Sequence, residues 1–142
     1  MPDRNEMDQA IKSLILPRLR EMGFKGSLPH LHRPRNGACD FLTIQFLSVG
    51  GAFTIEIARA SKDGLLFHGR HIPVTKLNST YLQPRHRLGA PLSGGDHWYR
   101  FDVSGTEAAA KQVLADLGSP SVWSLVDSFP VSEVSDSAAR AI

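Results

Sequence analysis

Residues 42–57 have the sequence LTIQFLSVGGAFTIEI, in which two stretches of alternating apolar and polar residues flank a pair of glycines. This alternation is typical of strands that bury one face, and Gly-Gly between two such stretches favours a β-hairpin. With the turn at Gly50-Gly51, Phe46 is expected to face Ile55. Both apolar sets then lie on one side of the hairpin, whereas a slip by a single residue would separate them.

An N-terminal helix is expected before the hairpin, from Asp3 to Met22. Asp3 and Glu6 have the spacing of a capping box, and apolar residues recur at the helical period. Pro17 removes one backbone hydrogen bond, so we expect a kink there. Gly23-Phe24 has the pattern of a Schellman end, in which the glycine adopts a left-handed conformation.

Two C-terminal helices are expected after the hairpin. The first begins at Ser104, with Glu107 at capping-box spacing, and ends at Gly118. The second begins at Ser119-Pro120 and ends before Pro130.

Additional strands are expected at residues 28–33, 85–88 and 97–103, with a short one near 70–75. The first is interpreted as an edge strand because Pro29 lacks a backbone donor, and a second copy of the chain would find it open for pairing. Residues 61–83 are weakly patterned, and the sequence does not decide between a lid and an inert loop. The oligomeric state is equally undecided.

Together these elements predict an α+β fold: an antiparallel sheet of four to six strands, with the N-terminal helix and two C-terminal helices on one face. The opposite face, with Thr43, Gln45, Thr54 and Glu56, is expected to be solvated or to dock a partner. Residues 1–130 are expected to form a single domain, and 131–142 a flexible tail. The predicted core comprises Ile11, Leu14, Leu19, Phe24, Leu42, Ile44, Phe46, Phe53, Ile55, Ile57, Phe101, Val113, Leu117 and Leu125.

Composition and charge narrow the class of protein. The chain has 142 residues, 42% hydrophobic and 21% charged, which excludes collagen-like, disordered and disulfide-scaffold proteins. Cys39 is the single cysteine, and we see neither a signal peptide nor a membrane-spanning run, so a cytoplasmic protein is expected. Residues 59–100 carry a net charge of +5 and residues 101–142 one of −4, so the middle of the chain is basic.

Several of these segments resemble a known bacterial family. They are the helix ending in Gly23-Phe24, the strand with Ile44-Gln45, the segment Arg85-His86-Arg87-Leu88-Gly89, and Asp96-His97-Trp98-Tyr99. Their order and spacing across about residues 7–129 are similar to the domain of unknown function 4304 family. The resemblance implies an intracellular bacterial α+β domain without an established activity, and some members look like single-domain immunity-type proteins.

Residues able to support catalysis or metal binding do not form a recognisable pattern. His30 and His32 share a strand face, but zinc needs three or four converging ligands, and the sequence has no HExxH or paired CxxC. Cys39 has no assigned base and is interpreted as structural. We therefore assign no catalytic residue, no metal site and no cofactor.

The candidate binding residues lie on two neighbouring stretches of the basic region. Arg85 and Arg87 share one strand face, and Trp98 and Arg100 would share a face of the next strand, with Asp96 at its start. Paired strands would set guanidinium groups beside the indole, a surface suited to a protein, a phosphate or a base. The alternative is an internal Arg–Asp pair, with Trp98 in the core.

These residues leave three functional hypotheses. The first is a non-enzymatic, immunity-like protein that binds another protein through Arg85, Arg87, Asp96, Trp98 and Arg100. The second is binding of nucleic acid or another anion by the same face. The third is a small hydrolase or metalloenzyme that uses the histidines.

Overall fold

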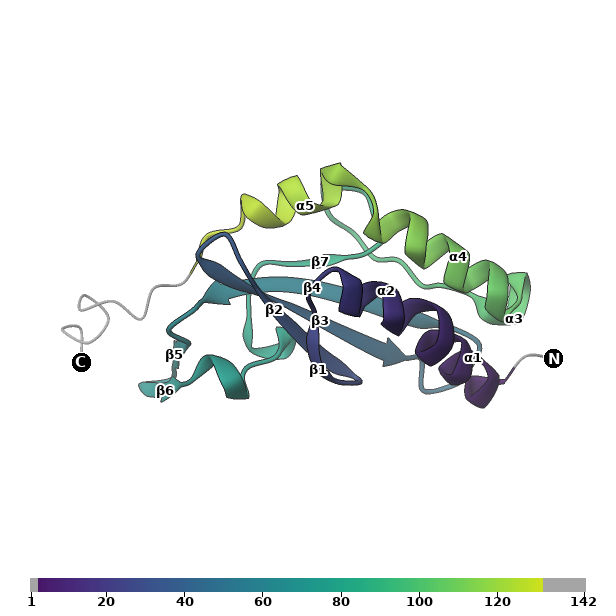
Figure 1. The fold of residues 1–142 in the computed structure, drawn as a ribbon, viewed down its shortest axis with the longest axis horizontal. Coiled ribbons are helices and arrows are strands. Elements are labelled where there is room, and N and C mark those ends of the chain that lie inside the picture. The colour runs from purple at the N-terminus through teal and green to yellow at the C-terminus, as the bar shows by residue number, and fades with distance from the viewer. Residues whose placement is uncertain (1–2, 132–142) are drawn as a thin grey trace.

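The expected hairpin forms the centre of the molecule. In the computed structural model, which describes residues 3–131, β3 (Ala38–Phe46) and β4 (Phe53–Ser61) pair antiparallel over their nine-residue lengths. The antiparallel sheet has five strands in the order β1-β2-β3-β4-β7, and the longer helices cover one face of it (Figure 1). The expected α+β class and layering are therefore confirmed. Of the tail expected at 131–142, residues 132–142 lie outside the described residues.

The predicted register of the hairpin is wrong by two residues. Phe46 faces Phe53 rather than Ile55. The error lies in the turn: Leu47 N–H still donates to Ala52 C=O at 2.9 Å, so the loop spans Ser48 to Gly51 instead of two glycines. Because side chains alternate with a period of two, this shift leaves the apolar faces where they were expected.

The remaining strands and helices complete the two layers of the fold. The strands are β1 (Lys25–Ser27), β2 (His30–Arg35), β5 (Leu65–Phe67), β6 (Arg70–Ile72) and β7 (Arg85–Arg87). The helical elements are α1 (Arg4–Ala10), η1 (Ile11–Ile15), α2 (Leu16–Glu21), η2 (Val74–Lys76), η3 (Ser79–Tyr81), α3 (Phe101–Ser104), α4 (Thr106–Leu117) and α5 (Pro120–Asp127).

The N-terminal helix has both predicted ends. Asp3 accepts a hydrogen bond from the backbone of Glu6, and Gly23 has a φ of +100°. Phe24 N–H donates to Leu19 C=O at 3.0 Å, as a Schellman end requires. Before Pro17 the backbone passes through the π-turn η1, where Leu16 N–H donates to Ile11 C=O. The helix therefore accommodates the missing proline donor by a wider turn.

The expected strand at 97–103 and the helix start at Ser104 are wrong. Only Tyr99 bridges to the sheet, against Phe53, and α3 begins two residues later. Gly105, with a φ of +89°, separates α3 from α4, and no side chain caps α4. The serine therefore ends a short helix instead of starting a long one.

The two edges of the sheet also differ from expectation. The predicted edge strand at 28–33 is an inner strand, because β2 pairs with β3 along its whole length and β1 forms the edge. At the other edge, β7 and Tyr99 do not pair with each other. They lie one after the other along β4, and residues 89–98 leave the sheet between them.

Helices and sheet enclose a single large core on the helical face. Eleven of the fourteen predicted core residues are buried there, whereas Leu14 is 42% exposed and Phe46 and Leu125 are partly buried. Leu14 lies on η1, where the wider turn changes the angular spacing that the helical period assumes. Met7, Leu31, Tyr99 and Val126 complete this core.

Residues 61–83 cover the other face of the sheet, which we expected to be solvated or to dock a partner. They form the β5–β6 hairpin and the turns η2 and η3 beneath the sheet (Figure 1). Leu65, Leu77 and Leu82 pack there against Cys39 and Phe41 in a second core. Thr43 and Glu56 are buried under this cover, where both accept a hydrogen bond from Ser79. Thr54 is also buried and donates to the backbone carbonyl of His97, so among the four polar residues expected on this face only Gln45 is exposed.

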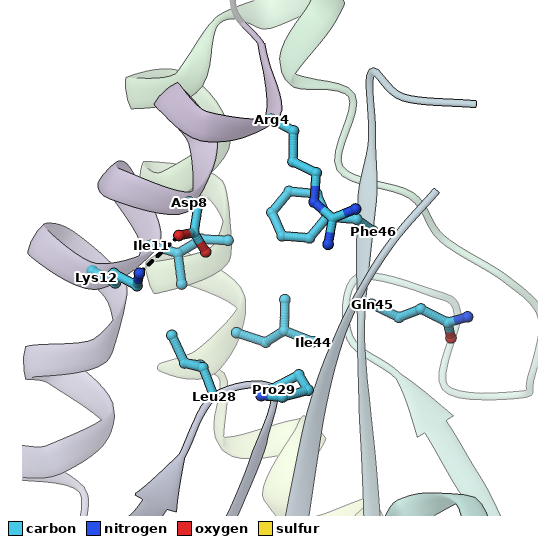
Figure 2. Close-up of a pocket in the computed structure, with 9 residues that line it drawn as sticks. All are labelled: Arg4, Asp8, Ile11, Lys12, Leu28, Pro29, Ile44, Gln45 and Phe46. Carbon is cyan, nitrogen blue, oxygen red and sulfur yellow. Dashed lines mark ion pairs between the residues drawn. The ribbon is translucent and has the colours of Figure 1, made fainter. Parts of the chain in front are cut away.

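A groove of about 420 Å³ remains between α1 and the end of β3 (Figure 2). Its walls come from the start of the N-terminal helix, the β1–β2 turn and the last residues of β3. The helices thus cover the sheet face but leave this corner of it open.

Tyr99 joins the edge of the sheet to α4 and provides a test of this packing. Its hydroxyl donates to Asp116 Oδ2 at 2.6 Å, and its ring stacks on Phe53. Tyr99→Phe should lower the free energy of unfolding by about 1–3 kcal/mol, because it removes a hydrogen bond to a charged acceptor. Urea denaturation measures this loss. Tyr81→Phe, on a side chain that is 38% exposed, is the control and should change little.

Candidate functional site

The candidate binding residues Arg85 and Arg87 lie on β7 beside a buried carboxylate. Arg87 is the cross-strand partner of Glu56, and its Nε donates to Glu56 Oε2 at 3.0 Å. Arg85 donates from the same face to Oε1 at 2.9 Å. Ser79 adds a hydrogen bond to Oε1 from the covering segment. The arginines therefore hold a buried charge as well as facing solvent.

The loop at 89–98 brings Trp98 to Arg87. Asp96 closes the base of this loop: its carboxylate accepts from Arg87 at 3.1 Å, from Trp98 Nε1 at 3.1 Å and from the backbone of His97 at 2.9 Å. The Arg87 guanidinium lies 5.6 Å from the centre of the Trp98 ring. Gly89 has a φ of +88°, and any Cβ there would collide with the His97 ring.

The fifth predicted residue, Arg100, is held by a separate ion pair. Its guanidinium makes two hydrogen bonds to Asp102, at 3.0 and 2.8 Å. By donating these bonds, Arg100 lowers the pKa of Asp102 below its usual value. Among the described residues the structure thus joins Arg85, Arg87, Asp96 and Trp98 into one network, with Arg100 outside it.

Elements of both sequence interpretations are present in this network. Guanidinium and indole do meet, yet they do so because a loop returns to β7 and not because two strands pair. Arg87 does pair with Asp96, but the main partner of both arginines is Glu56, which the sequence interpretation did not consider. Trp98 is partly exposed and lies outside both hydrophobic cores.

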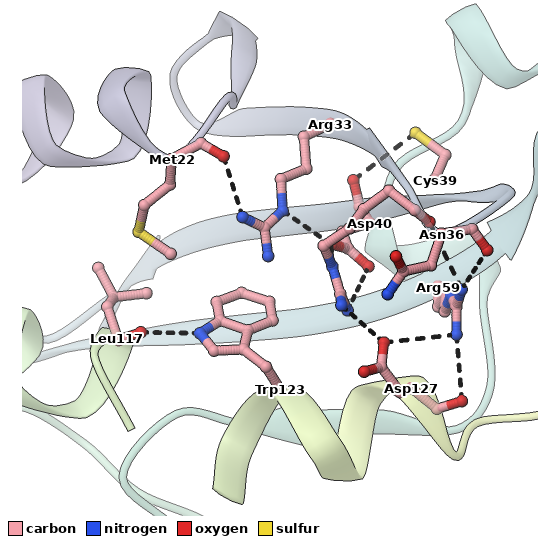
Figure 3. Close-up of polar contacts among 10 residues, drawn as sticks. Met22, Arg33, Asn36, Cys39, Asp40, Arg59, Leu117, Trp123 and Asp127 are labelled. Atoms are coloured by element: carbon pink, nitrogen blue, oxygen red, sulfur yellow. Dashed lines mark hydrogen bonds and ion pairs between the residues drawn. The ribbon is translucent and has the colours of Figure 1, made fainter. Parts of the chain in front are cut away.

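A second arginine network on the helical face was missed by the sequence reasoning (Figure 3). Asp40 is fully buried on β3, and its carboxylate accepts from Arg33 Nε at 2.8 Å and from Arg35 Nε at 2.6 Å. Arg35 also pairs with Asp127 at 2.6 Å, and Arg59 donates to the Asp127 carbonyl at 3.1 Å. These bonds fasten the end of α5 to the sheet.

Arg33 is also enclosed by aromatic rings. Its guanidinium lies 4.7 Å from the Phe24 ring centre and 4.4 Å from that of Trp123, and it donates to the Met22 carbonyl at 3.0 Å. Trp123 in turn donates to the Leu117 carbonyl at 2.7 Å (Figure 3). With its arginines buried in this way, the network is a structural clamp.

In the described part of the chain, no histidine side chain and no cysteine thiol hydrogen-bonds to a carboxylate of either network. His30 contacts Thr43 at 3.0 Å, and within residues 3–131 no group of three His, Cys, Asp or Glu side chains converges on a common point. Burial, followed by the nearby Asp40 charge, raises the pKa of the Cys39 thiol to about 11. At neutral pH this thiol is protonated, and a protonated thiol is a poor nucleophile.

Comparison with known protein families identifies the chain. Residues 15–125, which include α2, all seven strands, the network around Trp98 and Asp40 with its arginines, match the model of a domain of unknown function, DUF4304. The chain belongs to the DUF4304 family. The match confirms the resemblance seen in the Gly23-Phe24 and Arg85–Gly89 segments. No curated protein and no solved structure matches this DUF4304 chain. In the described part of the domain, no helix is long and apolar enough to cross a membrane.

The charge balance around Glu56 predicts the effect of removing its partners. Replacing Arg85 and Arg87 together with glutamine leaves a carboxylate that is only 12% exposed without a counter-charge. We expect the free energy of unfolding to fall by about 1–3 kcal/mol, less than for a fully buried pair because the arginines are about a third exposed. Adding Glu56→Gln should recover part of that loss in urea denaturation. Failure to recover any of it would show that the arginines stabilise the fold through other contacts.

The buried His86 side chain is expected to make the free energy of unfolding depend on pH. Its side chain faces the helical side of the sheet on β7, opposite Ile57, and burial lowers its pKa from the usual 6.5. The unfolded chain therefore takes up the proton first. Above about pH 7 His86 is neutral in both states and does not make the free energy of unfolding depend on pH. As the pH falls below 6.5, the free energy of unfolding decreases by at most about 1.4 kcal/mol per pH unit, because the proton binds more favourably to the unfolded chain.

Urea denaturation between pH 7.5 and 5.5 measures this slope. His86→Leu should reduce it, whereas His68→Asn, on an exposed residue, should leave it unchanged. Equal slopes for His86→Leu and the unmodified protein would contradict the assignment.

Proposed function

We propose that this DUF4304 domain is a non-enzymatic protein that binds another protein through Arg85, Arg87, Asp96 and Trp98, with Arg100 beside them. The observation that carries the proposal is the fixed position of Trp98. Asp96 holds the edge of the indole and Arg87 covers its face, while part of the ring stays open to solvent. An aromatic side chain ordered before binding loses little entropy on association, and tryptophan and arginine dominate binding energies at protein interfaces.

The ion pairs of this surface favour a protein partner over a nucleic acid. Arg85 and Arg87 share Glu56 and Asp96, and Arg100 is paired with Asp102. Phosphate binding draws on cationic groups free to replace counterions, and these guanidinium groups are largely compensated. Tryptophan and arginine are instead enriched at protein interfaces, and paired charges suit the polar rim that surrounds such residues.

The same residues support a binding role without catalysis in the bacterial cytoplasm. Arginine, aspartate and tryptophan in fixed ion pairs suit recognition, and the protonated Cys39 thiol does not suit nucleophilic attack. A single cysteine kept as a buried thiol fits a reducing compartment. An immunity-like role, in which the domain binds and blocks another protein, is the form of this proposal that the family resemblance favours.

The test is a comparison of variants in a pull-down from lysate of the source organism. Trp98→Ala should lower the affinity for the captured protein by about tenfold or more, the loss typical of a hot-spot residue. Arg18→Ala is the control, because Arg18 lies on α2 and its side chain is 51% exposed. Replacing Arg85 and Arg87 would be a poorer test, because it also leaves the buried Glu56 carboxylate unpaired and so destabilises the fold.

The outcomes separate the hypotheses. A stoichiometric partner that is retained by Arg18→Ala and lost by Trp98→Ala supports the proposal. A partner bound equally by both variants contradicts the assigned surface. Binding of DNA or RNA that weakens steeply with salt would replace the protein partner by a nucleic acid.

A further inference from the structure

The groove beside α1 has an apolar floor. Ile11 and Ile44 are buried at its base, with exposures of 1% and 5%, and Leu28 and Pro29 form one wall. In Figure 2 these four side chains point into the space between helix and strand, whereas Gln45 points away from it. A volume of about 420 Å³ lies at the lower end of the range for small-molecule sites.

The rim of the groove carries a net positive charge. Arg4 lies over the Phe46 ring, with its guanidinium carbon 4.6 Å from the ring centre (Figure 2). Lys12 reaches the rim from η1 but is paired with Asp8 at 2.9 Å. Within residues 3–131 no carboxylate lies within ion-pair distance of Arg4, in contrast to Arg85, Arg87 and Arg100. In the described part of the chain, the Arg4 guanidinium is therefore a cation without a carboxylate partner at the rim of an apolar cavity.

We propose that this groove binds a small amphipathic carboxylate. The carboxylate pairs with the Arg4 guanidinium, and the apolar part of the ligand lies along Ile11, Leu28 and Ile44. Planar guanidinium groups bind carboxylates through two parallel hydrogen bonds, and stacking on Phe46 keeps that plane fixed. The volume suits a single ring or a medium-length alkyl chain.

This site is independent of the proposed protein-binding surface. The groove residues belong to α1, η1, the β1–β2 turn and β3, and none of them belongs to β7 or the 89–98 loop. A ligand in the groove and a protein on the Trp98 surface therefore require different side chains. Variants of one site test it without removing a residue of the other.

The experiment uses three probes with the same tail: octanoate, octanol and octylammonium. Isothermal titration calorimetry with the full chain should show saturable, one-to-one binding of octanoate at millimolar or lower concentration. Octylammonium should bind at least about tenfold more weakly, because its charge faces Arg4 instead of pairing with it. Methyl NMR should show octanoate-dependent shifts of Ile11, Leu28 and Ile44.

Two variants test whether the Arg4 guanidinium binds the carboxylate. Arg4→Gln should reduce octanoate affinity by about tenfold and leave octanol binding unchanged, since only the charged hydrogen bonds are removed. Arg18→Gln keeps the groove intact and should change neither. Equal affinity for octanoate and octylammonium, an unaltered affinity in Arg4→Gln, or the absence of saturable binding would each overturn the proposal.

Discussion

Two buried carboxylates, one on each strand of the central hairpin, are held by the same arrangement of arginines. Asp40 on β3 is the cross-strand partner of Arg33 on β2, and Glu56 on β4 is the cross-strand partner of Arg87 on β7. In each case a second arginine two residues away closes on the same carboxylate. A buried charge is tolerated only when paired, so the two strands that flank the hairpin, β2 and β7, are each held to one position on it by charge as well as by backbone bonds.

Features with a local cause could be predicted from the sequence. The alternation at 42–46 and 53–57 predicts which face of the hairpin is buried, because successive side chains of a strand point to opposite faces. Asp3 and Gly23 predict the ends of the N-terminal helix, because helix caps depend on residues close in the chain. The register was missed because several loop lengths suit a Gly-Gly pair. The helix start at Ser104 was missed because Gly105 reverses the backbone there.

Features that depend on distant segments could not be predicted in this way. The cover formed by 61–83 has little periodicity of its own and is ordered by packing on a sheet face that the sequence alone presents as polar. The residues of the Trp98 network are all candidate binding residues in the sequence, but Glu56, the partner that Arg85 and Arg87 share, lies on another strand. Arg33-Pro34-Arg35 has the same spacing as Arg85-His86-Arg87, and that repeat was the available signal for the Asp40 clamp.

The 89–98 loop leaves the sheet after Leu88 and returns at Tyr99, with both ends bonded to β4. The loop is thus an insertion into an otherwise continuous edge, anchored at its base by Asp96. Lengthening such an insertion costs little closure entropy. A change of length or sequence at the tip of this loop is therefore expected to leave the core intact. The loop is in effect a variable segment on a rigid frame, the arrangement by which antibody domains diversify what they recognise.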